Sequence, residues 1–166
     1  MTDPENQALV PTTPAKNLAL NPHSDEAAGA IFGLATAIEW LSMPKSDKRL
    51  SDFQFKCQFA PDGKLSDIVN SVIGIVHVWA KQIEVENSVT GEIDQCVATG
   101  LLCSDGKVYT AVSIGIKKSL ASIMKTHGHP ATWTEPRYYM VRQVGPALKR
   151  MLVLQEAEPT SKEKRK

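Results

Sequence analysis

The chain has 166 residues, of which 42% are hydrophobic and 22% charged, a balance typical of a folded globular protein rather than a disordered one. A chain of this length holds one domain with its tails. The three cysteines follow no CxxC or other ligand spacing and suggest neither a disulfide framework nor a zinc site, and no apolar run is long enough to cross a membrane. Because no secretory leader is evident either, we expect a cytoplasmic protein without a membrane partner.

The N-terminal part is predicted to be a flexible arm followed by a helix. Residues 1–24 contain four prolines among Thr, Asn and Ala, which bury little and break helices. Ser24 or Asp25 then suits a helix cap, and apolar residues recur at helical spacing as far as Leu41. Pro44 predicts where this helix ends.

A short strand is predicted next. In residues 53–59, Phe and Cys alternate with Gln and Lys, the period of a strand with one buried face. We therefore expect Phe53, Phe55 and Phe59 in the core, and a turn at Asp62-Gly63 to end the strand.

The rest of the chain predicts three strands, a helix and two strands. The strands are expected at 72–85, 93–103, 107–112, 137–144 and 148–154, and the helix runs from Ser113 to Gly128. Turn signals separate them at Thr90-Gly91, Ser104-Asp105-Gly106 and Gly145-Pro146, and Gly74 suggests a bend.

This order is the connectivity of the five-stranded OB barrel, which binds oligonucleotides. We therefore expect an α+β, mainly β, fold: one OB-like domain over 25–155, with the N-terminal helix and strand, and a disordered basic tail over 156–166. A half-open β-sandwich or an unrelated α+β sheet has the same order.

Charge is distributed unevenly along the chain. Residues 1–94 contain seven Lys or Arg against thirteen Asp or Glu, whereas residues 95–150 contain eight against two. The basic stretch coincides with the predicted strands and helix, which favours an anionic partner, although a merely solvated face explains it as well.

Enzymatic signatures are absent from the sequence. There is no GxxxxGK[ST] loop, GxSxG elbow or HExxH helix. His127 and His129 have no accompanying Cys or carboxylate cluster, and the acidic residues of the first hairpin surround a single turn. We expect no enzyme, no cofactor and no metal, with a catalytic fragment lacking its partner domain as a distant alternative.

Aromatic and basic residues in the strands suggest single-strand nucleic-acid binding, in which bases stack on rings and cations contact phosphates. The stacking candidates are Trp79, Tyr109, Trp133 and Tyr139. The phosphate candidates are Lys81, Lys107, Arg137, Arg142, Lys149 and Arg150, with Lys117, Lys118 and Lys125 of the helix in second rank.

Core packing is an equal alternative for two of the aromatic residues, Trp79 and Tyr138. Tyr109 and Tyr139 are stronger candidates, because Val108 and Met140 beside them offer the opposite face for burial.

Two stretches resemble the single-stranded DNA-binding proteins of bacteriophages. They are Asp105-Gly-Lys-Val-Tyr-Thr-Ala-Val-Ser113 and, after the helix, Gly128-His-Pro-Ala-Thr-Trp133-Thr-Glu-Pro136, and the resemblance covers about Ile75 to Leu154. It implies a protein that coats exposed DNA strands during phage replication or recombination, without chemistry. Many such proteins end in an acidic tail that recruits replication proteins, whereas this chain ends in Lys164-Arg165-Lys166, which puts that recruitment in doubt.

The sequence leaves other partners open. RNA is an alternative to DNA, and the runner-up function is an interaction or structural module that pairs with copies of itself through the N-terminal helix and exposed strand edges.

Overall fold

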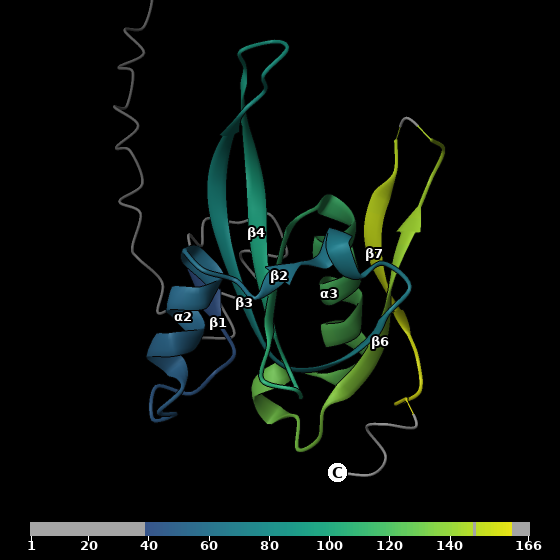
Figure 1. Ribbon diagram of the computed structural model, residues 1–166. Coiled ribbons are helices and arrows are strands. Elements are labelled where there is room, and N and C mark those ends of the chain that lie inside the picture. Colours follow the sequence, from purple (N-terminus) through teal and green to yellow (C-terminus); the bar gives the residue numbers. More distant parts are fainter. Residues whose placement is uncertain (1–38, 148, 161–166) are drawn as a thin grey trace, which may run out of the picture.

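The computed structural model describes residues 39–147 and 149–160 (Figure 1). In chain order the elements are β1 (Glu39–Leu41), α2 (Leu50–Gln58), β2 (Gly63–Lys64), the 3₁₀ turn η1 (Leu65–Ile68), β3 (Val72–Glu86), β4 (Ile93–Cys103), β5 (Val108–Val112), α3 (Ile114–His127), the 3₁₀ turn η2 (Pro130–Thr132), β6 (Arg137–Val144) and β7 (Met151–Glu156).

The fold is α+β and mainly β, with two α-helices in the described part of the chain against a curled, open sheet (Figure 1). The seven strands of this part are ordered β2-β5-β4-β3-β6-β7, and β1 pairs with β3. All neighbours are antiparallel except β2 and β5. The expected order of three strands, a helix and two strands is confirmed for β3 to β7, and the five-stranded OB-like barrel stays a prediction.

Local sequence signals placed most of these elements correctly. Gly91 and Gly106 adopt positive φ angles of 70° and 82° in the turns on either side of β4, a conformation that glycine adopts without a steric cost. Gly128, with a φ of 73°, ends α3 where it was expected. The final strand begins three residues later than predicted, at Met151.

The strand predicted over residues 53–59 is wrong, because residues 53–58 lie in helix α2 and Phe59 is its C-cap residue. Phe53 and Cys57, four residues apart, are 1% and 7% exposed, whereas Phe55 and Phe59 are 56% and 73% exposed. The phenylalanine spacing fits both a period of two and a helix. Contact between one helix face and the sheet decided in favour of the helix.

The end of the predicted N-terminal helix is also corrected. Glu39 to Leu41 form strand β1, which pairs with Lys81 to Trp79 of β3. The remainder of that predicted helix and the flexible arm lie outside the described residues, as do the last six residues of the basic tail.

Two hydrophobic clusters pack against the two faces of the sheet. The inner cluster contains α3 residues such as Leu120 together with strand residues such as Leu101 and Tyr139. The outer cluster contains Phe53 and Cys57 of α2 together with strand residues that include Trp79. Both faces of the central strands are therefore buried near α2.

A β-bulge in β3 decides which side chains face inward. The pairing with β4 shifts between Ile75 and His77. As a result, Ile75 and Val78 both belong to the inner cluster, although they are an odd number of residues apart. Trp79 consequently faces the outer cluster under α2.

Close approach at Gly100 lets α2 lie on the sheet. A Cβ atom at this position would overlap the Sγ atom of Cys57.

In the described residues, no helix is long and apolar enough to cross a membrane.

Candidate functional site

Eight of the ten predicted binding residues lie in three separate parts of the fold. At the end of the sheet near the β4–β5 turn lie Lys107, Trp133 and Arg137. In the β6–β7 hairpin lie Arg142, Lys149 and Arg150. On the outer side of β3 lie Trp79 and Lys81.

Trp79 is a core residue with its polar atom satisfied. Its side chain is 2% exposed, and its indole Nε1–H donates a hydrogen bond of 2.6 Å to the Glu39 carboxylate. A base therefore finds no open face on this ring.

The expectation that Tyr109 and Tyr139 face away from the core is wrong. Tyr139 is 2% exposed and belongs to the inner cluster, and Tyr109 packs against the same cluster. Burial raises the pKa of both phenols above their usual value. For Tyr109 the reason is that α2 covers the outer face of the sheet. Val108 is therefore buried on the outer face while its neighbour Tyr109 packs on the inner face.

Trp133 holds the end of α3. Its Nε1–H donates to the carbonyl oxygens of His127 and Gly128, at 3.3 and 3.2 Å. The ring is half-buried, and the guanidinium carbon of Arg137 lies 5.4 Å from its centroid. Helix capping and this cation–π contact account for the residue without a nucleic acid.

The predicted cations of the β6–β7 hairpin are exposed, as is Lys107. Arg142 donates a hydrogen bond of 3.3 Å to the Asn70 side chain. Lys81 is half-buried beside the outer cluster.

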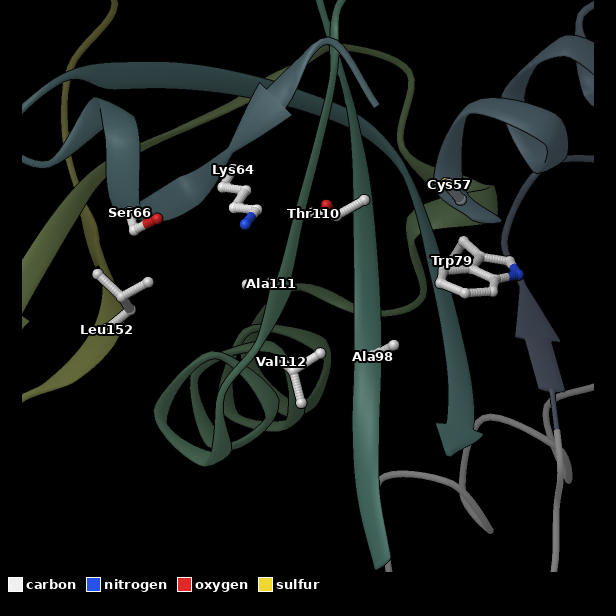
Figure 2. Close-up of a pocket in the computed structure, with 9 residues that line it drawn as sticks. All are labelled: Cys57, Lys64, Ser66, Trp79, Ala98, Thr110, Ala111, Val112 and Leu152. Carbon is white, nitrogen blue, oxygen red and sulfur yellow. The ribbon is translucent and has the colours of Figure 1, made fainter. Parts of the chain in front are cut away.

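An open hollow of about 410 Å³ lies where the outer face of the sheet meets its β5 edge (Figure 2). The lining residues are Cys57, Lys64, Ser66, Trp79, Ala98, Thr110, Ala111, Val112 and Leu152. Strand pairing explains part of the set, since Lys64 lies opposite Thr110, and Ala98 lies opposite Val112. In Figure 2 the Lys64 side chain extends from β2 into this hollow.

A smaller hollow of about 190 Å³ adjoins the first, because Val112 lines both. Its wall includes Lys117 and the side chains of Ile114 and Cys96. Val112 and Ile114 are 55% and 62% exposed, which is unusual for large aliphatic side chains.

The charged side chains that line the two hollows are all basic. None of the residues lining them is Asp or Glu, whereas Lys64 and Lys117 line them. Lys81 lies opposite Ala98 of the larger hollow. The surface thus combines exposed aliphatic side chains with three lysines.

The loop that leads into β2 is fixed by Asp62. Its carboxylate accepts a hydrogen bond of 2.8 Å from the Val108 N–H, and its own N–H donates to the Val108 carbonyl at 2.9 Å. The Val108 N–H also lowers the pKa of the Asp62 carboxyl. This contact aligns Lys64 with β5.

The thiol of Cys57, in the larger hollow, is not activated as a nucleophile. Burial raises the pKa of the Cys57 thiol far above its usual value, so the thiol stays protonated. Across residues 39–147 and 149–160, no three His, Cys, Asp or Glu side chains are grouped so that they could hold a metal ion.

Sequence reasoning missed Lys64 and ranked Lys117 second. The Asp62-Gly63 signal suggested a plain turn, whereas Gly63 begins a two-residue strand parallel to β5. Such pairing joins residues 46 positions apart and leaves no local signal in the chain.

No family model, no curated protein and no solved structure matches the chain.

Proposed function

We propose that this protein binds single-stranded DNA without catalysing a reaction, on the outer surface of β4 and β5. The observation that carries the proposal is the pair of adjoining hollows, which three lysines border and no carboxylate lines. Phosphates dominate the affinity of proteins for nucleic acids, so hollows lined by cations and by no acidic side chain favour them.

The strand order supports this location. We infer that β3, β4, β5, α3, β6 and β7 correspond to the strands and helix of an OB-like barrel that remains open between β5 and β7. OB barrels bind oligonucleotides over their second and third strands, which here are β4 and β5.

In the proposed complex, Lys64, Lys81 and Lys117 contact phosphates, and bases lie against Val112 and Ile114. Trp79 and Tyr139 are left out as stacking platforms because each ring is only 2% exposed. Coating of strands in phage replication or recombination is the biological role that we attach to this activity.

The test is an anisotropy titration of full-length protein with a labelled, unstructured oligonucleotide at several salt concentrations. Each of Lys64→Gln and Lys117→Gln is expected to weaken binding and to reduce the log–log salt slope by about 0.7. Lys125→Gln is the matched control, because Lys125 is an exposed lysine of α3 outside both hollows.

The proposal fails if the wild-type protein binds no oligonucleotide at low salt, or if Lys125→Gln weakens binding as much as the other two variants. Parallel titrations with DNA and RNA of one sequence, in a series of lengths, identify the preferred strand and the site size.

A further inference from the structure

Two long hairpins extend from the sheet toward the same side (Figure 1). One is formed by β3 and β4, which pair with each other as far as Glu86 and Ile93. The other is formed by β6 and β7. The outer part of the first hairpin has no further strand partner in the described residues, because β5 reaches β4 only at Ala98.

The β3–β4 hairpin is acidic. Beyond Lys81, its charged residues are Glu84, Glu86, Glu92 and Asp94, and no Lys or Arg occurs between residues 82 and 106. All four side chains are exposed, and none forms an ion pair with a described Lys, Arg or His. Glu84 accepts a hydrogen bond of 2.8 Å from the Gln95 amide.

The β6–β7 hairpin is basic. It carries Arg142, Lys149 and Arg150, and no Asp or Glu occurs between residues 136 and 155. All three side chains are exposed, and none has an acidic partner within the described part of the chain.

Both hairpins also expose aliphatic side chains. On the acidic hairpin, Val85, Val89 and Ile93 are 39%, 90% and 65% exposed. On the basic hairpin, Val144 and Met151 are 41% and 39% exposed and lie opposite each other. Large apolar side chains among charges of one sign are typical of a surface that meets a partner.

We propose that two copies of this chain associate through these hairpins, the acidic hairpin of each copy against the basic hairpin of the other. Because the hairpins extend in one direction, a two-fold axis along that direction brings both unlike pairs together at once (Figure 1). Opposite charges then meet at both contacts and the aliphatic side chains are buried between them.

Nucleic acid is a poorer partner for this surface as a whole, because four carboxylates of the acidic hairpin repel phosphates. The contact uses none of the residues that line the two hollows, so it does not rest on the proposed DNA binding.

Sedimentation velocity of the full-length protein over a concentration series tests the proposal. The wild type is expected to form a dimer that weakens as salt is raised. Two reversed variants are needed. The first is Glu84→Lys with Glu86→Lys and Glu92→Lys, and the second is Arg142→Glu with Lys149→Glu and Arg150→Glu.

Each reversed variant alone should be monomeric, since its two hairpins then carry charge of one sign. An equimolar mixture of the two should restore the dimer, because one variant supplies basic hairpins and the other acidic ones. The matched control reverses three lysines of α3 and should keep the wild-type dimer; its changes are Lys117→Glu, Lys118→Glu and Lys125→Glu. If a reversed variant does not fold, the corresponding Gln variant replaces it and should weaken the dimer at least tenfold.

Three results would overturn the proposal. They are a wild type that stays monomeric, a dimer that survives both reversals, and a mixture that remains monomeric. Loss of oligonucleotide binding in the second variant, with its dimer unchanged, would assign the basic hairpin to nucleic acid instead.

Discussion

The indole N–H of Trp79 donates a 2.6 Å hydrogen bond to the carboxylate of Glu39, and so joins β3 to β1 across 40 residues of sequence. The tryptophan ring lies in the outer cluster beneath α2, where it is 2% exposed. This contact makes Trp79 part of the scaffold under the proposed binding surface.

Trp79→Phe should therefore reduce the free energy of unfolding by about 1 to 3 kcal/mol, because a hydrogen bond to a charged group is lost. Urea denaturation measures the change, and Glu39→Gln, which keeps an acceptor, should cost less. Oligonucleotide affinity of the folded Trp79→Phe protein should stay at the wild-type value. A stable variant with weakened binding would instead identify Trp79 as a stacking residue.

Two phenylalanines of α2 provide a direct test of its buried face. Phe53→Ala should destabilise the protein by about 3 to 5 kcal/mol, because a fully buried ring leaves a cavity. Phe55→Ala should change stability by less than about 0.5 kcal/mol, because that ring is 56% exposed. Thermal unfolding of both variants checks the contrast, and equal losses would contradict the helix.

Gly100→Ala should destabilise the protein by about 1 to 3 kcal/mol, because the new methyl group overlaps the Cys57 side chain. The same change in a Cys57→Ala background should cost less, since the sulfur atom is then absent. A double-mutant cycle of unfolding free energies measures this coupling. Additive effects would mean that α2 does not rest on Gly100.

His77 should make stability depend on pH. Burial lowers its pKa below the usual 6.5, and the nearby positive charge of Arg49 lowers it further, while Asp47 acts in the opposite direction. Between the folded-state value and 6.5, the unfolded chain takes up a proton that the folded chain does not. The contribution of His77 to the free energy of unfolding is therefore fully present above pH 6.5 and is lost as the pH drops below 6.5.

Urea midpoints of the wild type and His77→Gln between pH 8 and 5 test this expectation. The wild type should lose stability on acidification, and the variant should lose less over the same range. Parallel curves for the two proteins would exclude His77 as the source.

The sequence by itself determined the elements whose signals are local. Strand β4 begins and ends as predicted at Ile93 and Cys103, because turn residues with positive φ angles at Gly91 and Gly106 bound it. The apolar stripe of α3 likewise follows from spacing along one segment, and Ile116 and Leu120 are buried as expected.

Only the tertiary structure decided which face of each element is buried. Phe53, Phe55 and Phe59 fit a strand until the sheet selects the helical face that holds Phe53 and Cys57. The bulge between Ile75 and His77 and the cover by α2 likewise bury Trp79, whereas Tyr139 is buried in the inner cluster with α3. The parallel pairing of β2 with β5 aligns Lys64 with Thr110. These outcomes depend on contacts between segments distant in sequence, where burial free energy outweighs the small differences in local propensity.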